Sequence, residues 1–471
     1  MKKTKKFLAL ALSAAMVVTA FAGCGSDSGN TTTESTTAGT TEEGSTAEST
    51  TEGTTESTAS NEPVTLRLWA HWGSEQRRPT IDKIIEQFNE TYADQNISAE
   101  YVYVPYDDIE TKMLASVTAG NPGNVVITAI ESVNSKAMRN QAMNITEYLS
   151  DGIEDQFYDA YWDMVVWNDD VYAIPFNTDT RLVFYNKEMF EEAGVSVDDL
   201  TSWDAMIEAC EKLDAAYAND ENYMLAFYPT LGNFGFDTLL AANDGSVYDD
   251  RLNPEVPTAN SQACVETLEH MKVYADMYGA ELVQATIAAN AGGAQDLFLG
   301  RKVAMFGNVC NYIATIAQYN AEAQVDYGVF AYPAGPSNTT GHTGASGGGF
   351  VCTVPYGASN PQESTLLAEF MATEGAVIWG EEQLDVMCCV EANENPAMAQ
   401  YVGWDETLEL MEYTVATRKN IYAPNATSYV NTAVDSICKN FTETDVQAVL
   451  DQAQEQMEAA IEEEKFIFGV Y

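Results

Sequence analysis

The chain has 471 residues, of which 71 are Asp or Glu and 22 are Lys or Arg, so its formal net charge at neutral pH is −49. This negative charge argues against nucleic acids and anionic membrane surfaces as partners. The roughly 400 residues that follow the first sixty exceed what a single hydrophobic core usually supports, so we expect a folded body of two lobes.

The first 23 residues are typical of a secretory signal peptide. Four lysines lie among the first six residues, and an apolar run over 7–22 follows them. This run is too short for a comfortable membrane span and ends in small residues before Cys24. That order resembles a bacterial lipoprotein box, although Phe21 replaces the usual aliphatic residue. We therefore predict lipid attachment at Cys24, with an ordinary secretory signal as the alternative.

Residues 24–62 form the next segment, which is rich in Ser, Thr, Gly and Glu. Such a composition cannot bury enough apolar surface to offset the entropy of ordering, so we predict a disordered linker behind the lipid-bearing cysteine. Its expected role is to hold the folded body away from the extracellular face of a bacterial cell membrane. A low-complexity tail without a role is the alternative.

The folded part opens with alternating strands and helices. Alternating apolar residues predict a strand over 64–70, and helical spacing predicts a helix that begins at Pro79. A second strand is expected near 97–104, a helix over 107–118, and a short buried strand over 125–128. This alternation predicts a parallel sheet with helical crossovers.

Two further helices are indicated later in the chain. Thr201 and Asp204 have the spacing of a capping box, and Trp203 opens the apolar face of the helix that follows them. A polar helix rich in Gln and Glu is expected over 444–464.

Seven cysteines follow Cys24, and their spacing matches no metal site. We expect buried, free thiols that pack as small apolar side chains. A disulfide between the adjacent Cys388 and Cys389 is the alternative.

Five segments carry a family resemblance in chain order. They are Leu-Arg-Leu-Trp-Ala-His-Trp at 66–72, the stretch 106–126 with Ala-Gly-Asn-Pro-Gly-Asn, Ala-Ile-Pro-Phe-Asn-Thr-Asp-Thr at 173–180 with Phe-Tyr-Asn-Lys-Glu-Met-Phe at 184–190, Phe-Leu-Gly-Arg-Lys-Val-Ala-Met at 298–305, and 327–350 with Gly-Gly-Gly-Phe at its end. Together they resemble the extracellular solute-binding proteins of sugar importers of the ATP-binding-cassette (ABC) type, the maltose-binding-like family 1. Two places differ: Asn124 stands where the family commonly has Asp, and the usual aromatic residue is missing near Val309.

The resemblance implies an α/β, two-lobe periplasmic-binding-protein-like fold of type II, in which each lobe is a sheet flanked by helices and the lobes are joined by a hinge. The N-terminal lobe is expected over 63–178 and 343–420, and the C-terminal lobe over 179–342 and 421–471. The chain is expected to cross between the lobes near 177–180, 343–350 and 420–424. The resemblance also implies a monomer that binds a carbohydrate, most simply an oligosaccharide, and passes this ligand to ABC permease subunits. We expect no catalytic activity, no cofactor and no metal ion.

A carbohydrate site needs flat aromatic surfaces for C–H faces and bidentate side chains for hydroxyl groups. Trp72 is the expected stacking platform, because it follows the first strand. Asp179 and Arg181 are the preferred polar pair, because they lie at the predicted hinge. The complete set of candidate ligand-binding residues is Trp69, His71, Trp72, Glu75, Asn121, Glu131, Asn177, Asp179, Arg181, Asn233, Phe234, Phe236, Asp237, Asn308, Asn311, Tyr312, Asn425 and Tyr429.

The sequence leaves other functions open. The same fold could bind a polyamine through carboxylates and aromatic rings. A surface-anchored carbohydrate-active enzyme or adhesin is also possible, since the acidic sequence contains many carboxylates that could pair for glycoside hydrolysis. The Gly-x-Ser-x-Gly pattern at 344–348 does not indicate an esterase, because every histidine precedes it.

Overall fold

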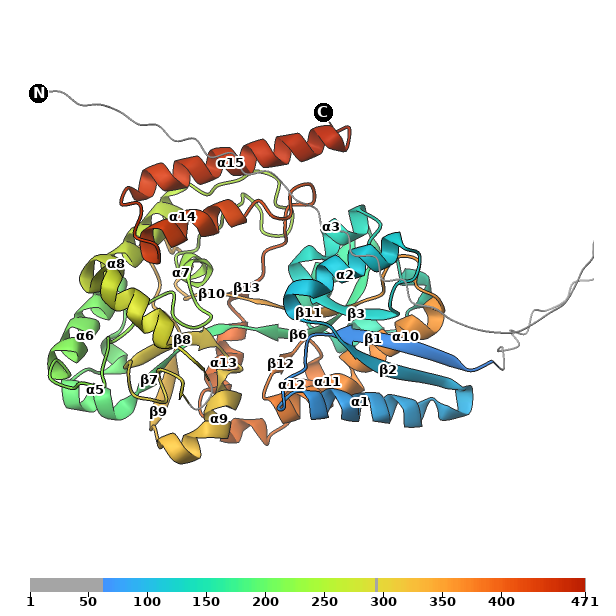
Figure 1. Cartoon of the computed structure of the whole chain (residues 1–471), viewed down its shortest axis with the longest axis horizontal. Helices are drawn as coiled ribbons and strands as arrows, with labels where there is room; N and C mark the ends of the chain where they lie inside the picture. Colours follow the sequence, from blue (N-terminus) through green and yellow to red (C-terminus); the bar gives the residue numbers. More distant parts are fainter. Residues whose placement is uncertain (1–61, 293–294, 471) are drawn as a thin grey trace, which may run out of the picture. The chain divides into compact units, whose positions relative to one another are not determined.

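The computed structural model describes residues 62–292 and 295–470. The predicted signal peptide, Cys24 and almost all of the linker lie outside the described residues. Two large hydrophobic cores form within the described part, and each is organised around a sheet with helices packed on it (Figure 1). We call them the first core, which contains Leu66, Phe176 and Trp379, and the second core, which contains Phe184 and Trp404.

The first core surrounds a six-stranded sheet with the strand order β12-β6-β11-β3-β1-β2. Its strands are β1 (Val64–Ala70), β2 (Ile97–Tyr103), β3 (Val125–Ala129), β6 (Ala173–Asp179), β11 (Gly348–Thr353) and β12 (Val386–Met387). β1 is parallel to β2 and β3, as the sequence predicts. The sheet as a whole is mixed, because β11 runs antiparallel between β3 and β6 and β12 is antiparallel to β6.

Helices lie above and below this sheet in Figure 1, with α1 and α11 on one side and α2 and α3 on the other. In α1, Pro79 occupies the first turn and the buried residues Ile81, Ile84 and Phe88 follow at helical spacing. The helices of this part are α1 (Arg78–Thr91), α2 (Tyr106–Thr118), α3 (Val133–Met138), α4 (Asp159–Val165), α10 (Pro361–Ala372), α11 (Glu374–Gln383) and α12 (Val390–Asn393). A small hairpin joins β4 (Val166–Trp167) to β5 (Asp170–Val171).

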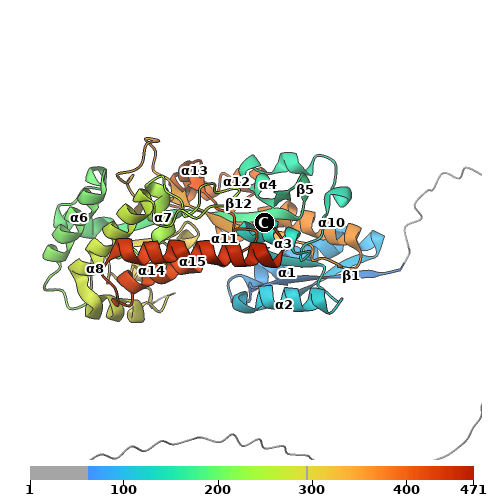
Figure 2. The same cartoon turned by 90° about the horizontal axis from the view of Figure 1, so that it is seen from above.

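The second core surrounds a three-stranded antiparallel sheet with the order β8-β7-β9. Its strands are β7 (Arg181–Asn186), β8 (Met305–Val309) and β9 (Tyr327–Phe330). The helices in this part are α5 (Lys187–Ala193), α6 (Trp203–Ala216), α7 (Phe236–Ala242), α8 (Gln262–Ala289), α9 (Tyr312–Ala323), α13 (Trp404–Met411), α14 (Ser428–Cys438) and α15 (Val446–Ile467). Figure 2 shows α14 and α15 running side by side next to α8.

Short 3-10 helices are also present in the described part. They span Ala93–Gln95, Ile130–Ser132, Thr146–Tyr148, Ile153–Gln156, Val197–Asp199 and Met398–Gln400.

The cap of α6 differs from the expectation. Ser202, rather than Thr201, is the N-cap residue, and its hydroxyl accepts a hydrogen bond from the Ala205 amide at 3.2 Å. A capping hydroxyl reaches the amide three residues ahead, and here Ser202 is the residue that directly precedes the helix. The expected apolar face is otherwise present, with Trp203, Met206, Cys210 and Leu213 buried and Ile207 partly buried.

Two of the links between the cores are short. β6 belongs to the first sheet and β7 to the second, with Thr180 between them. β10 (Ala345–Ser346) pairs with β13 (Thr414–Val415) just before β11 enters the first sheet. Met398, Trp404 and Leu410 belong to the second core although they precede residue 421, so the exact lobe limits stay a prediction.

All seven cysteines of the described part are buried and free, as expected from the sequence. Within the described ranges, none of the helices is both long and apolar enough to cross a membrane.

Candidate functional site

A cavity of about 640 Å³ lies beside the β6–β7 link. Its walls include residues of the first core's elements, such as Ala129 and Phe350, and of the second core's elements, such as Leu240 and Val430. This volume is within the range of roughly 300–1,000 Å³ that small-molecule sites occupy. We call this cavity the central pocket.

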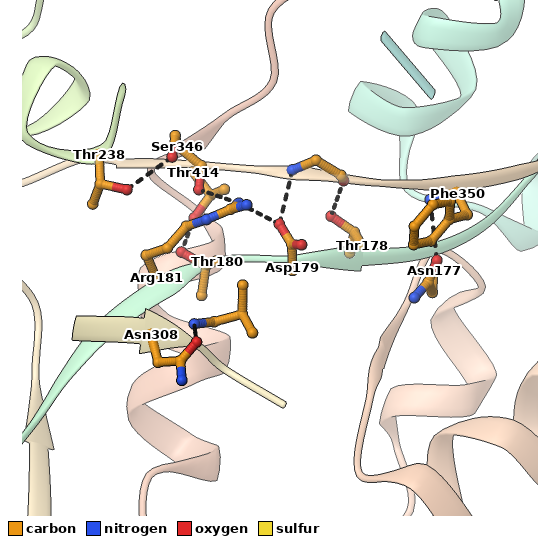
Figure 3. Close-up of polar contacts among 12 residues, drawn as sticks. Asn177, Thr178, Asp179, Thr180, Arg181, Thr238, Asn308, Ser346, Phe350 and Thr414 are labelled. Carbon is orange, nitrogen blue, oxygen red and sulfur yellow. Dashed lines mark hydrogen bonds and ion pairs between the residues drawn. The ribbon is translucent and has the colours of Figure 1, made fainter. Parts of the chain in front are cut away.

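An ion pair between Asp179 and Arg181 lines the central pocket (Figure 3). The Gly348 amide donates to Asp179 Oδ1 at 2.9 Å, and Arg181 Nη1 donates to the carbonyl oxygen of Ser346 at 2.9 Å. The Thr180 hydroxyl lies 2.6 Å from the hydroxyl of Thr414 on β13. The expected polar pair is therefore fixed where the two sheets meet.

Close backbone packing explains the glycines beside this pair. Gly349 has φ of +131°, and a Cβ atom there would lie 2.1 Å from the carbonyl oxygen of Asn177. A side chain would force β11 away from β6, so glycine permits the approach that brings the Gly348 amide to Asp179.

Aromatic rings form one wall of the central pocket. The His71 ring lies 5.1 Å from the Tyr106 ring and 4.7 Å from the Phe350 ring, between centroids. Tyr106 is 57% exposed, and all three residues line the cavity. We call these three residues the aromatic wall. His71 was among the candidate residues, whereas Tyr106 and Phe350 were not, although both lie within the segments that carry the resemblance.

His71 is uncharged at neutral pH. Burial lowers the pKa of its imidazole to about 4, and the nearby positive charge of Arg77 adds to this effect. Its Nδ1 atom is buried and has no hydrogen-bond partner among the described residues. A neutral imidazole can donate from one nitrogen and accept at the other, which suits a hydroxyl group.

Trp72 is not part of the pocket wall, which corrects the expectation that its indole is a stacking platform. The side chain is 1% exposed and packs against Trp379, with 4.2 Å between ring centroids, and against Phe176. The first strand ends in the core at this point, so the ring turns toward apolar neighbours. The neighbouring His71 instead reaches the cavity.

Polar residues of the second core's elements line another part of the central pocket. They are Asn233, Asp237 at the start of α7, and Asn311 at the start of α9. The Asp237 side chain is exposed to solvent within the pocket. The surrounding protein removes part of its hydration and raises the pKa of its carboxyl group, and the positive charge of Arg181 partly opposes that rise. All three were among the candidate residues.

Glu131 also lines the pocket and forms an ion pair with Lys419 at 3.3 Å. Lys419 follows β13 and was not a candidate residue. Three arginines at the pocket were missed as well: Arg77 before α1, Arg251 between α7 and α8, and Arg418 after β13. They lie in loops without a recognisable spacing, so the sequence offered no local signal for them.

Three aromatic candidates belong to the second core and do not reach the pocket. Phe234 and Phe236 are buried, and Phe234 packs edge-on against Phe227. Tyr312 is buried against Phe184 and donates to Asp296 Oδ1 at 2.5 Å. The expectation that these rings contact the ligand is corrected by their packing.

Three polar candidates have local structural roles outside the pocket lining. Asn177 Nδ2 donates to the buried Asp385 at 2.8 Å, and its Oδ1 accepts from the Phe350 amide at 3.0 Å. Asn308 Oδ1 accepts from the amides of Asn233 and Val309. Asn121 is exposed and accepts from Arg67 at 3.3 Å.

The remaining candidates are not among the residues that line the central pocket. Glu75 is exposed, and Tyr429 packs on the second core. Trp69 packs on a small apolar cluster near Gly123. Asn425 lines an adjoining cavity, which shares Tyr106, Glu131 and Phe350 with the central pocket.

Asn124, where the sequence departs from the family pattern, has a structural role. Its Oδ1 accepts from the Arg67 amide at 3.0 Å, and its Nδ2 donates to the Ser359 carbonyl at 2.9 Å and to Ser364 Oγ at 3.0 Å. An amide can donate and accept at once, whereas an ionised Asp could only accept. Among the described residues there is no group of His, Cys, Asp and Glu that could hold a metal ion.

Comparison with known proteins agrees with this architecture. A family model described as "Bacterial extracellular solute-binding protein" matches residues 72–378. A binding protein of Brucella abortus (strain 2308) is 24% identical over 257 residues, which cover 53% of this chain and 59% of that protein. An arabinooligosaccharide-binding protein of Halalkalibacterium halodurans is 22% identical over 223 residues, which cover 47% of each. The matched region thus spans about half of the curated relatives' length.

Among solved structures, that of CpMnBP1 with mannotriose bound is similar to this chain, with a TM-score of 0.71 and 21% sequence identity. The match covers 84% of this chain and 100% of that chain. At this identity the likeness establishes the fold, which is the two-lobe binding-protein fold expected from the sequence.

Proposed function

Because the chain belongs to the bacterial extracellular solute-binding protein family, we propose that it captures a carbohydrate of oligosaccharide size in the central pocket and delivers it unchanged to the permease subunits of an ABC importer. The names of similar proteins support the choice of ligand, since one is an arabinooligosaccharide-binding protein and another was solved with mannotriose.

The observation that carries the proposal is the make-up of the central pocket. The aromatic wall of His71, Tyr106 and Phe350 supplies flat surfaces for the C–H faces of a sugar. Asp179 and Arg181 supply bidentate groups for its hydroxyls.

The links between the cores suit a closing motion. A ligand that touches elements of both cores gains its full set of contacts only when they approach, so it favours the closed arrangement. The single residue Thr180 separates β6 from β7, which makes this link short enough to act as a hinge. The permease would then read the closed form of a monomeric binding protein.

The N-terminal part fits a lipid-anchored protein. Residues 1–23 would be removed as a signal peptide, and the acylated Cys24 would hold the protein at the extracellular face of the bacterial membrane. Residues 25–62 would serve as the spacer. The family's extracellular character supports this location.

We propose a receptor rather than an enzyme. Two of the three carboxylates that line the pocket, Glu131 and Asp179, are held in ion pairs, which suits fixed acceptors of hydroxyl groups. Glycoside hydrolysis instead needs a carboxylic acid and a carboxylate on either side of the scissile bond.

Recovery of the bound sugar tests this proposal. The full-length mature protein is incubated with a panel of plant and microbial oligosaccharides, separated from free sugar by gel filtration, and its bound sugar is identified by mass spectrometry. We expect one class of oligosaccharide to be recovered intact. Shortened products that accumulate during incubation would establish the enzyme alternative, and binding confined to insoluble polysaccharide would establish the adhesin.

A further inference from the structure

The charged side chains that line the central pocket differ in sign from the protein as a whole. The chain carries a formal charge of −49 and has 22 lysines and arginines. Five of these cationic side chains line the central pocket, against three carboxylates. The cations are Arg77, Arg181, Arg251, Arg418 and Lys419. The lining therefore has a formal excess of two positive charges.

Two of the cations are already neutralised by lining carboxylates. Arg181 pairs with Asp179, and Lys419 pairs with Glu131. Asp237 is the one lining carboxylate without an ion pair among the described residues. The other three cations are arginines, and none of them forms an ion pair with a described residue.

These three arginines differ in how their guanidinium groups are used. Arg418 donates to the carbonyl oxygens of Leu252, Asp163 and Val166, so it mainly joins backbone segments. Arg251 donates to the carbonyl oxygen of Gly245. The guanidinium of Arg77 makes no hydrogen bond within the described part of the chain, although its charge acts on the buried Asp385. Asp244 likewise acts on Arg251, and Asp163 and Asp250 act on Arg418. The formal excess of two positive charges therefore describes the lining side chains alone.

We infer that the ligand is an acidic saccharide, which carries at least one anionic group that Arg77 and Arg251 recognise. The inference rests on the proposed function and specifies its substrate class. A planar guanidinium matches a carboxylate or sulfate in geometry and can form two parallel hydrogen bonds with it.

Binding of a neutral sugar would leave the desolvation of the pocket arginines without electrostatic compensation. Closure of the pocket removes water from Arg77 and Arg251, and a neutral ligand offers no charge to offset that loss. A polyamine would add further positive charge beside them, so the lining disfavours that ligand even more. Repulsion by the acidic surface does not prevent binding, because salt screens charges beyond about 8 Å at physiological ionic strength.

Calorimetry with matched pairs of saccharides tests the inference. The wild-type protein is titrated with trigalacturonate and with the same trimer after reduction of its carboxyl groups, and with glucuronate-substituted and unsubstituted xylotriose. A sulfated galactose oligomer distinguishes a sulfate from a carboxylate. We expect the acidic member of at least one pair to bind about tenfold more tightly than its neutral counterpart. Preference for the sulfated oligomer would support the inference with sulfate as the anionic group.

Variants locate the anion site. Arg77→Gln and Arg251→Gln should each remove most of the preference for the acidic member. Arg78→Gln is the matched control, because Arg78 follows Arg77 directly but pairs with Asp82 at 2.8 Å and does not line the pocket. Should a variant unfold, the salt dependence of the wild type replaces it: affinity for the acidic member should fall with added NaCl more steeply than affinity for any neutral sugar.

The outcomes separate this inference from the proposed function. Binding of neutral saccharides alone, or equal affinity within every pair, would overturn the acidic ligand and leave the sugar receptor standing. Absence of binding by both the neutral and the acidic saccharides would overturn both.

Discussion

Asp179 and Arg181 form an ion pair across Thr180, at the point where the chain leaves the six-stranded sheet for the three-stranded sheet. Both partners also bind the segment around β10 and β11, through the Gly348 amide and the Ser346 carbonyl oxygen. The pair therefore joins two links between the cores and faces the central pocket. A change at either residue should affect both the stability of the links and the binding of a ligand.

Asp179→Asn should weaken both properties. The substitution leaves the half-buried Arg181 guanidinium without its charge partner, which should lower the free energy of unfolding by about 1–3 kcal/mol. Affinity for the oligosaccharide ligand should fall about tenfold, or roughly 1.4 kcal/mol. Denaturant titration and calorimetry measure the two effects.

The matched control is Asp326→Asn. Asp326 forms an exposed ion pair with Lys187 at 3.4 Å and does not line the pocket. Its loss should change the unfolding free energy by less than about 1 kcal/mol and leave affinity unchanged. Equal effects of the two variants would show that the Asp179–Arg181 pair has no special role.

Tyr106→Ala and Trp72→Ala should affect different properties, the first ligand affinity and the second stability. Tyr106 is 57% exposed and lines the pocket, so its loss should reduce affinity about tenfold with little effect on stability. Trp72 is 1% exposed, so its truncation should lower the unfolding free energy by about 3–5 kcal/mol. Thermal unfolding and calorimetry on both variants check this. A stable Trp72→Ala protein that has lost its ligand would contradict the placement of this indole in the core.

His270 should make the folded protein less stable in mild acid. Its imidazole stacks on Trp203 at 4.3 Å and hydrogen-bonds the Tyr332 hydroxyl at 2.6 Å, and burial lowers its pKa to about 3. Between pH 6.5 and about 3 the unfolded chain therefore binds a proton that the folded protein does not, so stability falls as pH falls through this window. The loss from this one group is of the order of a few kcal/mol.

The variant His270→Gln isolates this contribution. The amide keeps a polar partner for Tyr332 but does not titrate, so the unfolding free energy of the variant should depend less steeply on pH over the same window. Urea titrations of both proteins at a series of pH values provide the comparison. Identical slopes would mean that His270 is not held in its neutral form.

Cys24→Ser should release the protein from cells of a producing bacterium. The serine cannot carry the thioether-linked lipid, and a protein without that anchor has no other predicted attachment to the membrane. Fractionation followed by immunoblotting should find the variant in the medium and the wild type in the membrane pellet. Retention of the variant in the pellet would contradict lipid attachment at Cys24 as the means of membrane binding.

Much of the fold follows from sequence because its signals are local. Strand β1 alternates apolar residues, and α1 repeats them at helical spacing behind Pro79, so both elements are predictable without tertiary contacts. The antiparallel placement of β11 between β3 and β6 was not predictable in this way. It depends on pairing between residues far apart in the chain, such as Val351 with Pro175.

The site was predictable in part, because seven of the candidate residues line the central pocket: His71, Glu131, Asp179, Arg181, Asn233, Asp237 and Asn311. Asp179 and Arg181 were found because the hinge segment has a recognisable pattern. Arg77 and Arg251 were missed, since they come from loops that only the folded chain brings to one cavity. Trp72 was misassigned because sequence places it at a strand end without giving the direction of its side chain.

The most direct test of the central claim is calorimetric titration of the mature wild-type protein with the oligosaccharide panel that includes neutral and acidic members. We predict binding of at least one oligosaccharide with a Kd near 1 μM, about −8 kcal/mol, and about tenfold weaker binding to Asp179→Asn and to Tyr106→Ala. A panel in which no saccharide produces heat, or a ligand that binds both variants as tightly as the wild type, would contradict the assignment of the central pocket as a carbohydrate site.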